Sequence, residues 1–200
     1  MSGRSGPWRQ APRSAPVVIR SARGPRDIEA VRGLFQEYRQ WLANHREVTT
    51  FSDAILKTGL SLMDAEIASL PGPYAPRRGV LVLGIQGERP IACGALRPLS
   101  RNVGEIKRLF VRPALRGAGV GRSITQALLS RARRRGYRRV VLDTLPTMTE
   151  AIRLYRDLGF TPIPPYWKHP FPRALFFEYR FPSRSARASR LPSHAERPEE

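Results

Sequence analysis

The sequence predicts an α/β domain with a mixed, mostly antiparallel sheet and flanking helices. The first observation is an apolar strand at residues 103–111 that leads into a glycine-rich turn at 116–122. The second is the helix after this turn, in which apolar residues recur at spacings of three and four. The third is a strand at 139–143, which the helical crossover would place parallel to 103–111. Two neighbouring parallel strands are therefore expected at the centre of the sheet.

The remaining elements follow from the same patterns along the chain. The helix-start signals Pro25 and Asp27 and an apolar stripe predict a first helix at about 26–44, and a second helical region lies within 52–70. The expected strands are 17–20, 79–85, 90–99, 103–111, 139–143, 160–166 and 174–181. A last helix is expected at Met148–Leu158, before a closing hairpin of the two final strands.

Length and composition indicate one domain with irregular ends. The chain has 200 residues, of which 41% are hydrophobic, which is enough for one sizeable core. We assign 16–182 to the domain and expect disordered tails at 1–15, which is basic, and at 183–200. We expect neither a membrane-spanning segment nor a secretory signal, because the long apolar runs that both require are missing. The single cysteine, Cys93, fits a cytoplasmic location.

The formal charge of +19 comes almost entirely from arginine. Such a charge can indicate a nucleic-acid partner, or it can reflect a general bias toward arginine. We favour the bias, because the arginines are scattered and the densest group, within 131–139, lies at a helix end where the dipole favours cations. A nucleic-acid partner is therefore not expected.

The glycine-rich turn suits a phosphate ligand. Glycines at a helix start let backbone N–H groups face an anion, and the helix dipole adds positive charge. The turn lacks the ending of a Walker loop, and Gly117, Gly119 and Gly121 do not match the dinucleotide fingerprint. A tight connection that needs glycine only for steric reasons is the alternative.

The surroundings of the turn carry a family resemblance. Val-Arg-Pro at 111–113 precedes it, and A-I-x-L-Y-x-x-L-G-F follows about thirty residues later at 151–160. With these neighbours the R-x-x-G-x-G turn resembles the GNAT family of acyl-CoA N-acyltransferases, most clearly over 105–160 and more weakly over 17–181. K-R-L-x-V-R-P and L-D-T-L-P-x-M segments are similar to a subgroup of small bacterial members. The resemblance implies a GNAT fold in which acyl-CoA enters where the two parallel strands splay apart.

The resemblance also implies how acetyl-CoA, the co-substrate, would be held. The pantetheine arm would pair with the backbone of Leu109, Phe110 and Val111, and the pyrophosphate would contact the N–H groups of the turn. The turn residues concerned are Gly117, Ala118, Gly119, Val120, Gly121 and Arg122. Arg116 and Arg122 either add charge to the phosphates or are solvated loop residues. We expect no metal, because the histidines are too scattered for a site.

Tyr155 is the strongest candidate among the catalytic side chains. It occupies the tyrosine position of the family motif, where the hydroxyl would protonate the departing thiolate. The alternative is a tyrosine that only packs in the core. The family's usual Asn contact to pantetheine is absent or replaced, because Met148 stands at that position.

An amine acceptor also requires a base, because an alkylammonium ion is rarely deprotonated at neutral pH. Glu105 is preferred, and strand alternation places Lys107, Leu109 and Val111 on its face. Asp143, at the end of the parallel strand, is the second candidate. An ion pair with a neighbouring arginine is the alternative role for Glu105, and capping of the turn at 144–147 is the alternative for Asp143.

Two further features bear on the site. Cys93 lies within an apolar strand and is expected to be a buried structural thiol rather than an acyl carrier. The proline- and aromatic-rich segment 163–171 either covers the acceptor pocket, with Tyr166, Trp167 or His169 facing it, or is a hairpin loop packed on the sheet.

The sequence therefore predicts an N-acyltransferase that moves an acetyl group from acetyl-CoA to a small-molecule or peptide amine by direct attack in a ternary complex. Two alternatives remain at this point: a catalytically weak acyl-CoA-binding regulatory module, and a basic nucleic-acid-associated protein. Relatives are often dimers, so a homodimer is also open.

Overall fold

The computed structural model describes residues 15–45, 52–77 and 79–182. The tails predicted at 1–15 and 183–200 lie outside these ranges, apart from Ala15.

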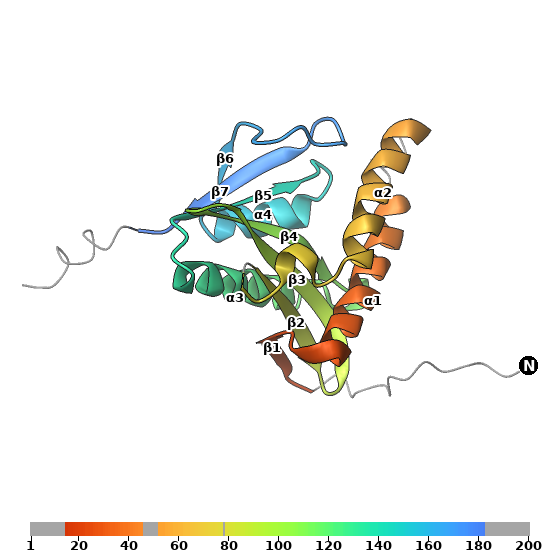
Figure 1. Cartoon of the computed structure of the whole chain (residues 1–200), viewed down its shortest axis with the longest axis vertical. Coiled ribbons are helices and arrows are strands. Elements are labelled where there is room, and N and C mark those ends of the chain that lie inside the picture. Colours follow the sequence, from red (N-terminus) through yellow and green to blue (C-terminus); the bar gives the residue numbers. More distant parts are fainter. Residues whose placement is uncertain (1–14, 46–51, 78, 183–200) are drawn as a thin grey trace, which may run out of the picture.

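Seven strands form one sheet in the order β1-β2-β3-β4-β5-β7-β6 (Figure 1). The strands are β1 (Val17–Ser21), β2 (Val80–Gln86), β3 (Arg89–Ser100), β4 (Val103–Val111), β5 (Arg139–Thr144), β6 (Thr161–Ile163) and β7 (Leu175–Arg180). The helices are α1 (Gly24–Ala43), α2 (Asp53–Ala68), α3 (Val120–Arg134) and α4 (Thr149–Asp157), with short 3₁₀ turns at Gly72–Tyr74 and Pro113–Leu115. The β4–β5 pair is parallel and the other described pairs are antiparallel, which confirms the predicted mixed sheet.

The predicted elements are all present, and their ends differ by a few residues. The largest difference is the strand expected at 160–166, which is only Thr161–Ile163 in the structure. Pro164 and Pro165 follow, and proline has no N–H to donate to a strand ladder.

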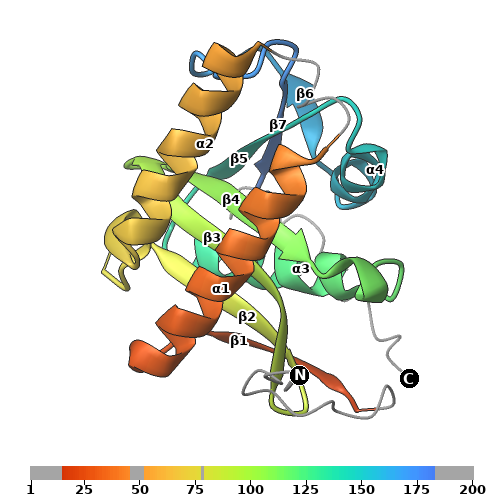
Figure 2. The same ribbon diagram turned by 90° about the vertical axis from the view of Figure 1, so that its right-hand side faces the viewer.

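The helices cover both faces of the sheet. Helices α1 and α2 lie on one face and α3 and α4 on the other (Figures 1 and 2). Val31, Phe35 and Met63 belong to the core under the first pair, whereas Ile124 and Leu128 belong to the core under α3. Because both faces are buried, β2 and β3 are nearly continuous apolar runs rather than alternating ones.

The parallel strands separate soon after they meet. Pairing between β4 and β5 covers Val103–Glu105 against Arg139–Val141, and the register ends there. The prediction that the central parallel pair splays apart is confirmed. Past this point, the two strands no longer bond to each other through their backbones.

A β-bulge interrupts β4 where it leaves β5. On β3, one residue separates Cys93 from Ala95, while two residues separate their partners Phe110 and Lys107 on β4. Arg108 lies in the extra position with φ 57°, a left-handed conformation that costs about 1–3 kcal/mol for a residue with a side chain.

The bulge changes which side chains share a face of β4. Strict alternation predicted that Leu109 and Val111 lie on the face of Glu105, and this was wrong. Both pack with Ile106 against the core under α3, while Phe110 joins the core under α1. The inserted residue shifts the alternation by one position, so the expected face holds only as far as Lys107.

The loop between β6 and β7 folds back against α2. Phe171 of this loop is buried with Leu42 and Leu145, and its ring lies directly on Gly59 of α2. A Cβ at Gly59 would lie 2.6 Å from Cζ of Phe171, so only a glycine permits this approach. A helix-interior glycine is normally unfavourable, and the loop contact explains this one.

We expect Gly59→Ala to lower the free energy of unfolding by about 1–3 kcal/mol relative to Gly33→Ala, because overpacking against the buried Phe171 ring opposes the helix gain. Gly33 is the matched control, a second helix glycine whose added Cβ would meet nothing within 4 Å. Its replacement should stabilise the protein by about 1 kcal/mol. Urea unfolding of both variants measures the difference, and equal free energies would show that Phe171 does not press on α2.

Candidate functional site

A cavity of about 800 Å³ lies between the diverging strands. It runs from the glycine-rich turn, along β4 and the start of α4, to α1 and the β6–β7 loop. Its lining includes Tyr38, Trp41, Leu42 and His45 of α1 and its end, 106–111 of β4, 115–117, 119, 121 and 122 of the turn, 142–145, 147–151 and 153–155, with Asp157, His169 and Phe171. It therefore joins nearly every region that the sequence singled out.

The glycine-rich turn presents free backbone donors at one end of the cavity. Gly117 and Gly119 have φ of 80° and 78°, the left-handed conformation that glycine adopts without strain. Gly119 is the N-cap of α3, whose first N–H groups have no acceptor within the helix. Gly117, Gly119 and Gly121 line the cavity, whereas the side chain of Val120 is buried in the core. The turn can thus hold an anion through its main chain, in the manner predicted.

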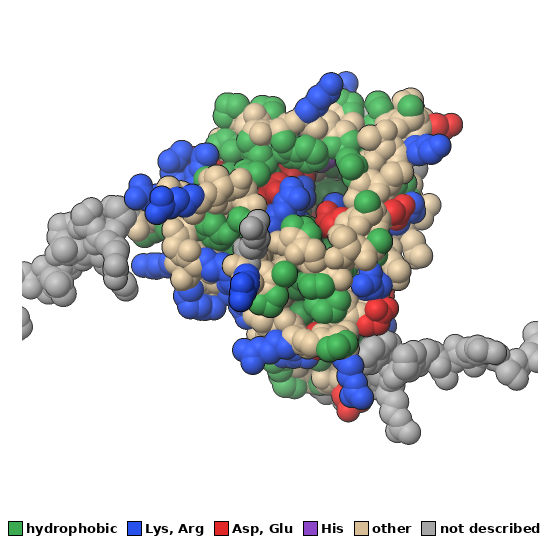
Figure 3. All heavy atoms as spheres, in the orientation of Figure 1, with side chains coloured by type: hydrophobic (Ala, Val, Ile, Leu, Met, Phe, Trp, Pro, Cys, Tyr) green, Lys and Arg blue, Asp and Glu red, His purple; other side chains and the backbone are tan. Residues whose placement is uncertain are grey.

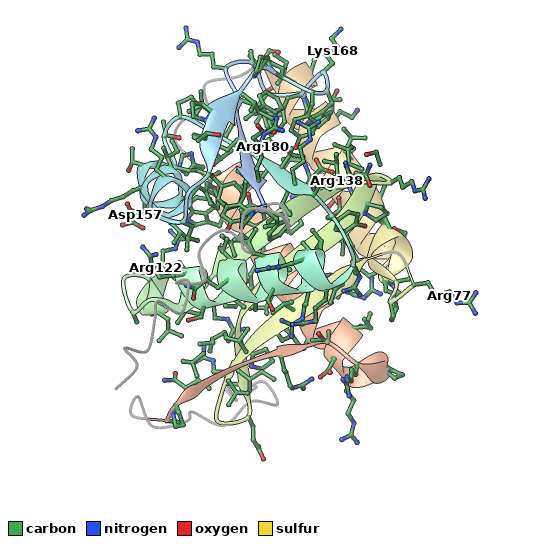
Figure 4. The ribbon with its side chains drawn as sticks, turned by 90° about the vertical axis from the view of Figure 1, so that its left-hand side faces the viewer. Arg77, Arg122, Arg138, Asp157, Lys168 and Arg180 are labelled. Atoms are coloured by element: carbon green, nitrogen blue, oxygen red, sulfur yellow. The ribbon has the colours of Figure 1, made fainter. Side chains whose placement is uncertain are left out.

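The two arginines of the turn have partners inside the protein. Nε of Arg116 donates to the carbonyl oxygen of Val111 at 3.2 Å, and its guanidinium lies 4.6 Å from the centre of the Trp41 ring. Arg122 pairs with Asp157 at 3.2 Å, and the two side chains face each other between α3 and α4 (Figure 4). Both arginines line the cavity, so a contact with the phosphates stays a prediction for each.

At the other end of the cavity, where backbone pairing between β4 and β5 has ended, an ion pair of side chains connects the two strands. The last paired residues of β4 and β5 are Glu105 and Val141, and Lys107 and Asp143 each lie two residues further along their strands. Nζ of Lys107 lies 2.9 Å from Oδ1 of Asp143 and 3.6 Å from Oε1 of Glu105. It also lies 5.0 Å from the centre of the Trp167 ring, within cation–π distance.

Asp143 is surrounded by donors. Nε2 of His169 lies 3.2 Å from Oδ2, and the Tyr166 hydroxyl lies 3.4 Å from Oδ1. Burial alone would raise the pKa of Asp143, but the charge of Lys107 and the hydrogen bonds from His169 and Lys107 outweigh it. The pKa of Asp143 therefore lies below its usual range. Its carboxylate contacts Lys107, His169 and Tyr166. The alternative role predicted for it was to cap the turn at 144–147.

His169 uses both ring nitrogens. Nδ1 lies 3.0 Å from the Phe171 nitrogen and 3.1 Å from the Phe171 carbonyl oxygen, while Nε2 faces the carboxylate of Asp143, which can only accept a hydrogen bond. The ring lines the cavity but has no free nitrogen to accept a proton from a substrate. It is placed to orient Asp143.

Glu105 lies behind Asp143 rather than in the cavity. Its side chain is buried; Nε of Arg97 donates to it at 2.6 Å and the Tyr166 hydroxyl donates at 2.9 Å. The arginine pair anticipated as its alternative role is present. Tyr166 connects both predicted bases, and burial together with the charges of Asp143 and Glu105 raises the pKa of its hydroxyl.

Tyr155 has the core packing considered for it, and its catalytic role stays a prediction. Its ring packs against Phe160 and Phe177 in the core, and it also lines the cavity. Burial, with smaller effects of Tyr38 and of the charge of Asp143, raises the pKa of Tyr155, so the phenol keeps its proton at neutral pH. Cys93 is fully buried and is absent from the cavity lining, as expected for a structural thiol.

The β6–β7 loop contributes to the site. Tyr166, Trp167 and His169 face the charged cluster, while Lys168 projects away from the body (Figure 4). Figure 3 shows basic, acidic and histidine side chains together in a hollow between this loop and α2. The loop is thus both packed on the sheet and part of the cavity wall.

Lys107 and Arg97 were not assigned to the site from the sequence, although one signal was present. Lys57, Lys107 and Lys168 are the three lysines among 35 Lys and Arg residues, and Lys107 alone lies in a strand. A lysine in a chain that otherwise uses arginine, two residues from a strand glutamate, was the available signal. Arg97 offered no comparable signal.

Comparison with known proteins assigns the fold and the class. Residues 30–160 match the model of the Acetyltransferase (GNAT) family. The chain belongs to the GNAT acetyltransferase family. It is 30% identical over 162 residues to an uncharacterized N-acetyltransferase of Schizosaccharomyces pombe, covering 80% of this chain and 92% of that one.

Solved structures agree with the fold. An acetyltransferase of Streptococcus agalactiae superposes with a TM-score of 0.67 at 16% identity, covering 82% of this chain and 98% of that one. PaiA N-acetyltransferase of Thermoplasma acidophilum, solved with coenzyme A, gives 0.64 at 12% identity, over 83% and 99%. The protein is thus a GNAT N-acetyltransferase that uses acyl-CoA. Within the described residues, no His, Cys, Asp and Glu side chains cluster as metal ligands would, and no helix could cross a bilayer.

We expect Asp143→Asn to lower the free energy of unfolding at pH 7 by about 3 kcal/mol, because the variant leaves a buried ammonium ion with Glu105 as a more distant partner. The folded-state pKa of Asp143 is depressed, so its contribution is present in full above about pH 5 and is lost as the pH falls below its ordinary value. The difference from wild type should therefore shrink toward pH 3. Urea titrations across this range measure it, with Asp64→Asn, in an exposed pair with Arg39, as control; a pH-independent difference would contradict the assignment.

Proposed function

We propose that this GNAT enzyme transfers an acetyl group from acetyl-CoA to an amine by direct attack within a ternary complex. The observation that carries the proposal is one cavity that extends from free backbone N–H groups at 117–122 to the Lys107–Asp143 cluster. The first end suits a pyrophosphate and the second suits a reacting acyl group and amine. The complex of the T. acidophilum protein with coenzyme A supports the same use of the fold.

The proposed seat of acetyl-CoA depends mainly on the backbone. Beyond Glu105, β4 has lost its partner on the β5 side, so the main chain of Leu109, Phe110 and Val111 is available to the pantetheine arm. These N–H groups would also polarise the thioester carbonyl. Arg116, now on the Val111 carbonyl, would turn toward the phosphates when the arm takes its place.

The proposed chemistry needs one proton acceptor and one donor. The acceptor reacts as the neutral amine, which is the minor form at neutral pH. Its nitrogen attacks the carbonyl carbon, the carbon–sulfur bond breaks, and the thiolate takes a proton from Tyr155. Asp143 receives the proton from the nitrogen, directly or through water, and this proton then returns through water to Tyr155, so that both groups regain their starting form. A carboxylate with a lowered pKa can still accept this proton, because the nitrogen becomes much more acidic once it is bonded to the carbonyl carbon of the acetyl group. Glu105, which is absent from the cavity lining, would act on Asp143 through Tyr166 and Lys107.

The proposed acceptor end is predominantly aromatic. Tyr38, Trp41, His45 and Phe171 line it, and Nδ1 of His45 is buried without a partner among the residues described. The nearby carboxylate of Asp143 already has Lys107 and His169 as partners. Such a wall favours a small-molecule or peptide amine with an aromatic or apolar body over a polyamine.

The deciding experiment is thiol release from acetyl-CoA with a panel of arylalkylamines, amino acids, peptides and polyamines, followed by mass spectrometry of the product. Release that depends on the amine, with one acetyl group gained by it, supports the proposal. Tight binding of acetyl-CoA without turnover on any amine would indicate a regulatory module. Steeply salt-dependent binding of DNA without acetyl-CoA binding would indicate the nucleic-acid role instead.

Gly121 lines the cavity, so we expect a Cβ in Gly121→Ala to hold the pyrophosphate away from the N–H groups of the turn. Acetyl-CoA binding should weaken by roughly tenfold to a hundredfold, the loss of about one charge-assisted hydrogen bond. The folded protein tolerates the change, since the new Cβ would lie 3.4 Å from Leu154, in ordinary contact. Calorimetric titration with acetyl-CoA measures the affinity, and thermal unfolding confirms that stability is unchanged. Wild-type affinity in this variant would show that the turn does not bind the pyrophosphate.

We expect Tyr155→Phe to lower kcat by about 10²–10⁴-fold while acetyl-CoA affinity stays close to wild type. Asp143→Asn should lower kcat more than Glu105→Gln does, because Asp143 receives the proton whereas Glu105 acts at one remove. Steady-state kinetics measure all three variants; a larger loss of kcat in Glu105→Gln than in folded Asp143→Asn would make Glu105 the base.

A further inference from the structure

The bulge in β4 is connected to helix α2 by a buried ion pair. Nε and Nη2 of Arg108 donate to the two carboxylate oxygens of Glu66 at 2.9 and 2.8 Å. The side chains of Arg108 and Glu66 are only 17% and 13% exposed. A two-bond fork of this kind fixes both the position and the direction of the guanidinium.

Glu66 is itself held in place. The hydroxyl of Tyr74, which is buried just after α2, donates to Oε1 of Glu66 at 2.7 Å. Burial alone would raise the pKa of Glu66, but the hydrogen bonds and charge of Arg108 lower it more. The carboxylate is therefore a charged, oriented group at neutral pH.

The backbone of Arg108 is the part of β4 that most needs such support. Its φ of 57° is one that side-chain-bearing residues rarely adopt, and it lies directly before Leu109–Val111. On its other side stands Lys107, which pairs with Asp143. A small rotation at Arg108 would therefore move the main chain proposed for the thioester arm relative to the proposed base.

We propose that Glu66 is a positioning residue, which holds the bulge of β4 in its active shape through Arg108 and so links α2 to the acyl-transfer site. The inference rests on the proposed function, because it assigns the bulge a part in placing the thioester. Helix α2 also carries Gly59, on which the β6–β7 loop rests, so the same helix supports both walls of the reacting end. Glu66 need not touch either substrate.

The test compares kcat/KM for acetyl-CoA in the wild-type protein and four variants, at a saturating concentration of an amine that supports thiol release. Glu66→Gln keeps the size of the side chain and removes its charge, whereas Arg108→Gly permits the same φ without the ion pair. The third is the double variant. Asp64→Asn is the matched control, on the same helix and in a two-bond pair with Arg39 that is exposed.

We expect Glu66→Gln and Arg108→Gly each to lose roughly tenfold to a hundredfold in kcat/KM, the scale of a small misplacement of reacting groups. The double variant should lose no more than Arg108→Gly alone, because Glu66 acts through Arg108. Asp64→Asn should stay within about twofold. If either single variant unfolds, Arg108→Lys is measured instead: it keeps the charge without the fork, and its kcat/KM should fall by more than the twofold limit set for Asp64→Asn.

Two results would overturn the inference while leaving the proposed function in place: wild-type kcat/KM in folded Glu66→Gln, or fully additive losses in the double variant. Absence of amine-dependent thiol release from the wild-type protein itself would overturn both proposals. Thermal unfolding of every variant separates a loss of stability from a loss of positioning.

Discussion

Two parallel strands that separate after three paired residues are the constraint on which the rest of this structure depends. Their separation leaves main-chain groups at depth without a strand partner, and buried polar groups of this kind need other partners. Arg116 supplies one such partner, because it donates to the carbonyl oxygen of Val111. The Lys107–Asp143 pair joins the two strands through side chains instead, and the bulge at Arg108 redirects the main chain. What remains is a cavity walled by backbone.

The charged end of this cavity is costly to build and difficult to change. Removing an ion from water is unfavourable unless its hydrogen bonds are replaced, and loss of one partner leaves the other buried and unpaired. Lys107, Asp143, Glu105 and Arg97 form one connected set, joined further by Tyr166 and His169. The site consequently behaves as one electrostatic unit, in which the base, its neighbours and local stability vary together.

Much of this fold was accessible from the sequence, because it depends on short-range patterns. Helical spacing, strand runs and turn residues placed every element, and the glycines of the turn indicated backbone donors for an anion. The bulge at Arg108 was not accessible, because alternation assumes a constant period of two. Nor did the sequence decide between Glu105 and Asp143, since burial behind Tyr166 depends on a loop sixty residues away. The sequence did not explain Gly59 either, because the Phe171 ring that contacts it belongs to a distant loop.

The lysine at the centre of the site differs in its contacts from the arginines that dominate the composition. Several described pairs of one arginine and one carboxylate form a fork of two hydrogen bonds, among them Arg39–Asp64, Arg108–Glu66 and Arg112–Glu37. Lys107 instead meets two carboxylates from two strands and an aromatic ring. A compact ammonium group can satisfy partners in several directions, whereas a planar fork is fixed to one. Composition alone would favour arginine here too, so the arrangement of the two carboxylates and the ring around the ammonium group accounts for Lys107.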